Sequence, residues 1–126
     1  DELFEVRTPL RKLKRFIRYH FTIYLAQPVF VKIFLFDAIY NAHFYSSNAY
    51  PPFKNYIESV YKILDEGKND GSIRPEINNR VFRNLFMGIF SHMAIRWLFT
   101  EKGSQTDKIE EIDAAVSMLS RAVASN

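Results

Sequence analysis

The side chains best suited to acid–base or metal chemistry are the histidines His20, His43 and His92, together with Asp37 in an apolar stretch. A zinc site needs three or four such ligands to converge. No two of the histidines have the HxxxH spacing that places two ligands on one face of a helix. We therefore expect no bound metal. Because an imidazole in an apolar wall can hydrogen-bond to a carboxylate or carbonyl group, His20 and His92 are candidate contacts for a small molecule.

The other parts of a catalytic site are missing from the sequence. It has no cysteine, no glycine-rich phosphate loop and no GxSxG nucleophile motif. Asp37 is the one carboxylate that we expect to face inward, and a single carboxylate does not make an acid–base pair. The sequence therefore predicts a protein that is not an enzyme and that holds no cofactor.

Aromatic residues are unusually frequent. Twelve Phe, seven Tyr and one Trp in 126 residues exceed what a compact helical core of this size requires. We predict that some of them, with methionine and histidine, enclose an apolar cavity for a small molecule. The alternative is that these side chains are ordinary core. The predicted ligand-binding residues are Phe16, His20, Phe36, Tyr40, Tyr56, Tyr61, Phe86, Phe90 and Met93.

The composition is that of one globular domain, which we place at residues 1–126. The net charge of +3 is too small to indicate nucleic-acid binding by itself. The most apolar run, residues 29–40, contains Lys32 and Asp37 and is shorter than the roughly 20 residues that a membrane span needs. We expect a cytoplasmic protein without a membrane segment.

Prolines and glycines divide the chain into five helical segments, with a possible sixth at its start. Thr8 is the expected N-cap of the first helix, with Pro9 at its first position. Residues 29–40 have strand-like local propensity, but we predict a buried helix because every neighbouring segment has helical periodicity. Residues 41–52 are predicted to be a loop. Residues 1–8 are predicted to be the end of a helix from a preceding domain.

The three later helices show clear boundary signals. Pro52 is expected to open the third helix, and Gly67 and Gly71 to end it. The fourth is predicted over residues 80–100, capped by Asn78 or Asn79. For the last helix, Asp107 and Glu110 have the spacing of a capping box. Gly88, in the middle of the fourth helix, is expected to permit close helix packing.

The order of these segments resembles the C-terminal domain of TetR/AcrR-type transcription regulators over nearly the whole chain. The resemblance is carried by TPLRKLKRFIRYHF, AQPVFVKIFLFDA, ILDEGKNDGSIRPEINNRVFRNLFMGIFSHMAIRWLF and IEEIDAAVSMLSRAV. It implies an all-α, five- to six-helix bundle. The DNA-binding helix-turn-helix of such a regulator would precede residue 1. The HF after the first helix and the long aromatic second helix are most similar to members that respond to fatty acids or acyl-CoA. Hydrophobic drugs or aromatic compounds are the second class of effector that we expect.

The last two helices also predict self-association. Their apolar arcs are wider than one small subunit can cover. The resemblance implies that they pair with their symmetry mates in a four-helix contact of a homodimer. The alternative is that both helices are simply central in the monomer. The predicted interface residues are Ile89, Met93, Trp97, Ala115, Met118 and Ala122.

Together these features predict the effector-sensing and dimerisation domain of a TetR-like repressor. Its ligand would be an apolar or amphipathic small molecule, and DNA would be contacted only through the N-terminal domain. Ligand binding would change the separation of two DNA-binding heads on a palindromic operator. The competing interpretation is a stand-alone helical module that binds lipid or another protein.

Overall fold

A computed structural model describes residues 8–99 and 103–126, and these residues are almost entirely helical. The predicted all-α fold is confirmed. Of the expected linking helix at residues 1–8, all but Thr8 lies outside the described residues. In chain order the elements are α2 (Pro9–Ala26), α3 (Pro28–Ile33), the π-helix η1 (Phe34–Ile39), the 3₁₀-helix η2 (Ala42–Ser46), α4 (Tyr50–Asp70), α5 (Asn79–Phe99) and α6 (Gln105–Val123).

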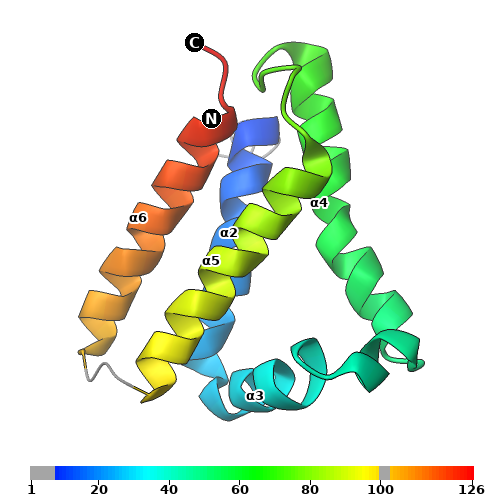
Figure 1. Cartoon of the computed structure of the whole chain (residues 1–126). Helices are drawn as coiled ribbons and strands as arrows, with labels where there is room; N and C mark the ends of the chain where they lie inside the picture. Colours follow the sequence, from blue (N-terminus) through cyan, green and yellow to red (C-terminus); the bar gives the residue numbers. More distant parts are fainter. Residues whose placement is uncertain (1–7, 100–102) are drawn as a thin grey trace.

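Helix α2 lies in the centre of the bundle and packs against α4, α5 and α6 (Figure 1). As predicted, Thr8 caps it, because its hydroxyl accepts a hydrogen bond from the Arg11 backbone N–H. Apolar residues at helical spacing on α2 are fully buried, among them Leu13, Ile17 and Phe21. Burial of this stripe from three sides gives the domain one continuous hydrophobic core.

The segment predicted as a buried helix is helical, but the prediction of burial is wrong. It forms α3 and then η1, which ends at Ile39. Only Val31 and Leu35 are buried, whereas Val29, Phe30 and Ile33 are exposed. The segment crosses one end of the bundle, so only one of its faces meets the other helices (Figure 1). Because residues 29–40 are apolar on all sides, their sequence does not determine how many faces of the helix other elements will cover.

Residues 41–52 are not the predicted loop. The 3₁₀-helix η2 occupies residues 42–46, and α4 already begins at Tyr50, two residues before the predicted start. Pro51 and Pro52 both lie in the first turn of α4, where the missing backbone N–H groups would have had no partner within the helix. The two prolines are therefore the second and third residues of α4, and the helix begins before them, at Tyr50.

Two glycines near the end of α4 have different roles. Gly71 is the C-cap, with a φ of 85° in the left-handed region that favours glycine. Gly67 lies within the helix, and a Cβ atom placed on it would fall 2.4 Å from Cδ1 of Ile73. Gly67 is thus needed for the close approach of the chain that turns back from α4. The prediction that both glycines end the helix is correct only for Gly71.

The starts of α5 and α6 are fixed by side-chain caps. The Asn78 side chain accepts a hydrogen bond from the Val81 N–H at 3.0 Å, in agreement with the predicted cap. The predicted capping box at Asp107 is wrong by three residues. Its N-cap is Ser104, whose hydroxyl accepts from the Asp107 N–H at 3.1 Å, while the Asp107 carboxylate accepts from the Ser104 N–H at 3.2 Å.

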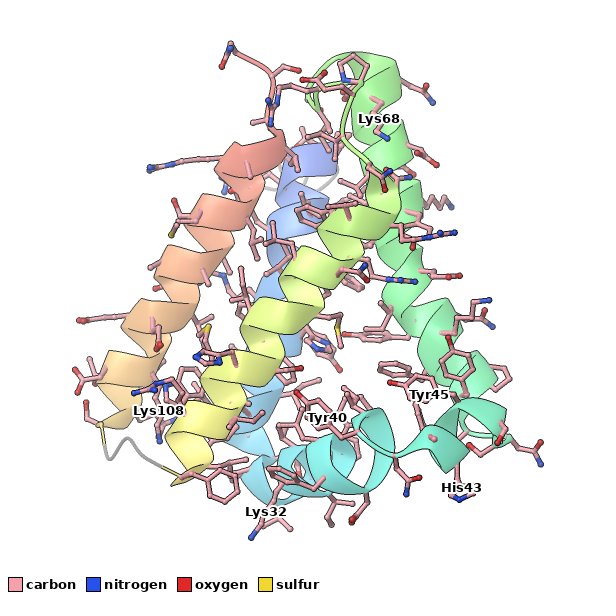
Figure 2. The ribbon with its side chains drawn as sticks, in the orientation of Figure 1. Lys32, Tyr40, His43, Tyr45, Lys68 and Lys108 are labelled. Atoms are coloured by element: carbon pink, nitrogen blue, oxygen red, sulfur yellow. The ribbon has the colours of Figure 1, made fainter. Side chains whose placement is uncertain are left out.

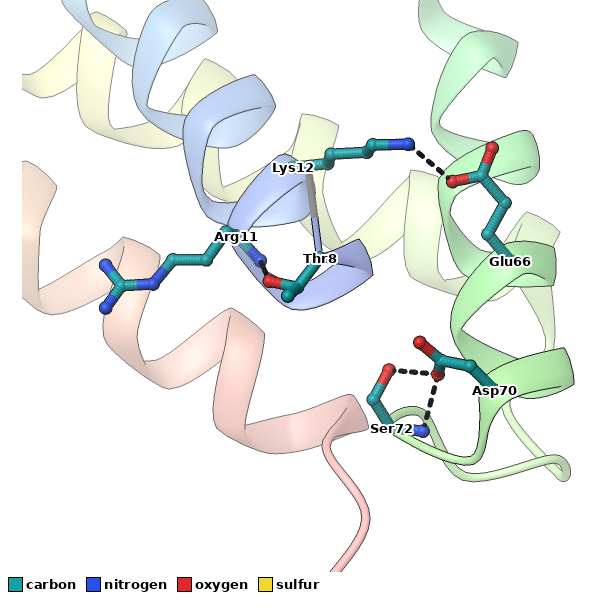
Figure 3. A network of polar contacts seen from close by, with 6 residues as sticks. All are labelled: Thr8, Arg11, Lys12, Glu66, Asp70 and Ser72. Carbon is teal, nitrogen blue, oxygen red and sulfur yellow. Dashed lines mark hydrogen bonds and ion pairs between the residues drawn. The ribbon is translucent and has the colours of Figure 1, made fainter. Parts of the chain in front are cut away.

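Polar contacts hold the end of the bundle that is opposite α3. Lys12 of α2 pairs with Glu66 of α4 at 2.9 Å, and the Asp70 carboxylate accepts two hydrogen bonds from Ser72 (Figure 3). The chain after α6 forms an isolated antiparallel bridge between Ile73 and Ala124. These contacts tie the end of α4 to α2 and the α4–α5 turn to the C-terminal residues. Within the described ranges no single helix is long and apolar enough to cross a membrane.

Candidate ligand-binding site

A hollow of about 480 Å³ lies between α4, α5 and the η1–η2 segment. Helices α4 and α5 are joined by a short turn and diverge toward the opposite end of the bundle, where η1 and η2 connect the other elements (Figure 1). The volume lies within the range of small-molecule sites. The lining residues are Ile39, Tyr40, Tyr45, Tyr50, Phe53, Lys54, Ile57, Glu58, Arg83, Met87, Gly88, Ser91, His92 and Ile95.

Aromatic rings form one end of the hollow. The ring of Tyr45 is edge-on to Tyr50, with centroids 5.2 Å apart, and Phe44 packs edge-on to Phe53 at 5.5 Å. The hydroxyl of Tyr45 donates a hydrogen bond to the Ile39 carbonyl at 2.8 Å, which ties η2 to the end of η1. Tyr40 and Tyr45 lie at the edge of the space between α4 and α5 (Figure 2). This end of the site is held by ring packing and by one side-chain hydrogen bond.

Helix α5 supplies the opposite wall through a face that does not point into the core. Phe86, Phe90 and Ala94 of this helix are buried against the core. Gly88 faces the hollow, and a Cβ atom placed on it would meet no atom within 4 Å. The prediction that Gly88 permits close helix packing is therefore wrong. The absence of a side chain at this position leaves space in the hollow.

The polar side chains of the hollow come from α4 and α5. Glu58 and Arg83 form an ion pair across the two helices at 3.7 Å. Lys54 and the exposed His92 also line the site. The hollow thus combines an aromatic and aliphatic surface with a few charged groups at one side. Such a surface suits a molecule that has both an apolar and a polar part.

Five of the predicted ligand contacts form a closed aromatic cluster outside this hollow. His20 is only 4 % exposed, and its ring packs on Phe90 and Phe86 with centroid distances of 4.3 and 5.0 Å. Phe16 contacts Tyr56 and Phe86. The cluster joins α2, α4 and α5. His20, Phe86 and Phe90 are buried, whereas Phe16 and Tyr56 are half-buried. None of the five lines the hollow.

His20 and Tyr56 form the polar pair inside that cluster. Nδ1 of His20 lies 3.2 Å from the Tyr56 hydroxyl, and Nε2 has no hydrogen-bond partner among the described residues. Burial lowers the pKa of His20 from 6.5 to about 4, because the charged imidazolium would lose its hydration. Burial also raises the pKa of Tyr56 to about 12. Both groups are therefore neutral at physiological pH.

The remaining predicted contacts are dispersed. Tyr40 lines the hollow. Phe36 is exposed and packs edge-on to Phe99 on the outside of the bundle. Tyr61 lines a second groove farther along α4, and Met93 is partly buried against the core. The structure therefore brings one of the nine predicted residues to the hollow.

The six residues predicted for a dimer interface also differ in exposure. Met118 is 71 % exposed and Ala122 is exposed, both on the outer face of α6. Ile89, Met93 and Ala115 are partly buried against the core. Trp97 is buried, and its ring packs on Tyr24 at a centroid distance of 5.0 Å.

Sequence reasoning missed most of the hollow because it searched for aromatic residues on the apolar stripes. The lining instead comes from the end of η1, from the 41–52 segment, from the first half of α4 and from the second face of α5. Signals for both were present in the sequence, since Tyr45 and Tyr50 crowd a segment interpreted as a loop and Gly88 interrupts a helix. His92, proposed from the sequence as a ligand contact, does line the hollow. No group of three or more potential metal ligands occurs in residues 8–99 and 103–126.

The fold and the hollow define an all-helical domain with space for a small molecule beside its core. Residues 9–106 match the family described as "Tetracyclin repressor-like, C-terminal domain". The chain belongs to this family, whose members are ligand-binding and dimerisation domains of transcription regulators and are generally not enzymes. The match covers α2 to the first residues of α6. No curated protein and no solved structure matches the chain.

Proposed function

We propose that this domain is the effector sensor of a homodimeric TetR-like repressor that is located in the cytoplasm. An apolar or amphipathic small molecule would occupy the hollow between α4, α5 and the η1–η2 segment. The observation that carries this proposal is the open space of about 480 Å³ next to Gly88. Aromatic rings form part of its wall, and Lys54, Glu58, Arg83 and His92 supply charged and imidazole groups. A solid interior at this position would have no room for an effector.

The proposal includes a mechanism for the response. The hollow lies between two helices that are linked to the core through α2, and α2 directly follows the N-terminal residues. A ligand that favours one separation of α4 and α5 would bias the position of α2, and with it a DNA-binding domain placed before residue 1. Such a ligand must bind the two arrangements with different affinities.

The proposed dimer uses the outer faces of α5 and α6. Val81 and Leu85 on α5 and Met118 on α6 are exposed apolar side chains. Ala115 and Ala122 flank Met118 at helical spacing, and small side chains allow two helices to approach closely. A two-fold contact through these faces would cover apolar surface that one subunit leaves exposed.

The decisive experiment fills the hollow from α5. In Gly88→Phe the new ring would occupy the space that the glycine leaves open, so we expect the affinity for an added amphiphile such as 1-octanol to fall by about tenfold or more. The matched control is Gly88→Ala, which adds a methyl group that meets no neighbour. It should retain binding and gain up to about 1 kcal/mol of stability from helix propensity.

Calorimetric titration measures the affinities, and native mass spectrometry of the purified chain detects a ligand that co-purifies. Unchanged binding in Gly88→Phe, with a native circular dichroism spectrum, would refute the hollow as the effector site. Sequencing the codons upstream of residue 1 separates the regulator from the alternative of a stand-alone lipid-binding or protein-interaction module. A helix-turn-helix is expected there.

A further inference from the structure

A second groove continues from the hollow along α4 toward the start of α5. It has a volume of about 800 Å³ and shares Lys54, Glu58 and Arg83 with the hollow. Because three side chains border both spaces, the two are adjacent parts of one elongated site. The groove has a different character, since no aromatic residue other than Tyr61 lines it.

The groove is strongly cationic. Its lining contains the four basic residues Lys54, Lys68, Arg80 and Arg83 and one carboxylate, Glu58, so the formal charge is four minus one, or +3. This equals the net charge of the entire chain, whose 17 basic and 14 acidic residues otherwise balance. The residues outside the groove lining therefore have no net formal charge, and the net positive charge of the chain corresponds to that of this groove.

Two of the four cations have no partner within the described part of the chain. Lys54 and Arg80 form no hydrogen bond or ion pair there. Lys68 donates to the Asn79 side chain at 2.8 Å, which leaves its charge without a carboxylate. Only Arg83 has an acidic partner, Glu58. Cations that line one groove repel one another, and an anion bound in the groove would relieve that repulsion.

We propose that the effector is an amphiphile whose apolar part occupies the hollow and whose phosphate-bearing head lies in the cationic groove. This inference rests on the proposed function of the hollow and adds the chemical class of the ligand. Lys54 and Arg83, at the boundary of the two spaces, would contact the head where it joins the chain. Arg80 and Lys68 would contact its distal part.

The charge of the groove favours a phosphate over other heads. A single carboxylate would neutralise only one of the three excess charges of the groove. A phosphate offers up to two charges and three acceptor oxygens, which match the guanidinium groups of Arg80 and Arg83 and the point charges of the lysines. A cationic head would meet four basic side chains.

Calorimetric titration of the 126-residue chain with four octyl compounds tests the proposal. We expect octyl phosphate to bind most tightly, followed by octanoate and 1-octanol, with octyltrimethylammonium weakest. Lys54→Gln and Arg80→Gln should each weaken octyl phosphate binding by about fivefold. Arg80→Gln should in addition leave 1-octanol binding unaffected, because Arg80 does not line the hollow. Glu58→Gln removes the only carboxylate of the groove and should strengthen octyl phosphate binding. Lys62→Gln, on α4 but outside both spaces, is the control and should change nothing.

The outcomes separate this inference from the proposed function. If 1-octanol or octyltrimethylammonium binds as tightly as octyl phosphate, the hollow is a ligand site but the phosphate assignment is refuted. If inorganic phosphate alone binds as tightly as octyl phosphate, the groove is an anion site unconnected to the hollow, which also refutes the proposal. If none of the octyl compounds binds, the proposed function fails and this inference fails with it.

Discussion

Burial of His20 should make the stability of the domain depend on pH in a defined window. The pKa of His20 falls from 6.5 in a solvated imidazole to about 4 in the folded chain, because the ring lies among Phe86, Phe90 and Tyr56 and is removed from water. Between these two values the unfolded chain binds a proton that the folded chain does not. The free energy of unfolding therefore rises with pH across this window.

The magnitude follows from the two pKa values. A difference of about 2.5 pH units corresponds to about 3 kcal/mol in total, and about 2 kcal/mol of this is lost between pH 7 and pH 4.5. Above pH 6.5 the protonation of His20 does not lower the free energy of unfolding. As the pH falls from 6.5 toward 4, the loss of stability due to His20 grows, and below pH 4 it changes no further. For a domain with a typical stability of about 5–15 kcal/mol, this loss is readily measured.

The assay is urea denaturation followed by helical circular dichroism at several pH values and one fixed protein concentration, since dimerisation would otherwise alter the apparent stability. His20→Gln cannot titrate but retains a polar partner for Tyr56. We expect the stability of His20→Gln to vary less with pH by about 2 kcal/mol between pH 7 and pH 4.5. Contributions that are the same in the parent chain and in His20→Gln cancel in this comparison. His43→Gln, at an exposed position, should keep the slope of the parent chain. Parallel pH profiles for the parent and His20→Gln would refute the reasoning.

Three further substitutions test the packing and the proposed dimer. Gly67→Ala should lower the free energy of unfolding by about 2 kcal/mol, because its Cβ would fall 2.4 Å from Cδ1 of Ile73; no loss in urea denaturation would contradict that contact. Gly71→Ala should cost about 1 kcal/mol in the same assay, because the φ of 85° strains any residue with a Cβ. Met118→Glu should convert a dimer into monomers in light scattering, whereas Val29→Glu, at a position equally exposed at 70 %, should not; a dimer that survives the first change would place the interface elsewhere.

Local signals in the sequence specified most of the helices. Thr8 followed by Pro9 marks the start of α2, and Gly71 marks the end of α4, because both signals act through a few adjacent backbone groups. The sequence also indicates the buried face of α6, because Ile112 and Val116 recur at helical spacing and both are buried. The family followed from the order of these segments and not from any single motif.

The ligand-binding site could not be predicted from such local signals, because it depends on which helix faces remain uncovered after packing. The sequence showed that α5 is apolar around most of its circumference, but only its packing on α2 decided that Phe86 and Phe90 would fill the core while Gly88 and His92 faced the hollow. It likewise left the exposed side of α3 unspecified. Helix boundaries are set by neighbouring residues, whereas a cavity is set by the angle between α4 and α5, and that angle results from contacts between segments far apart in the chain.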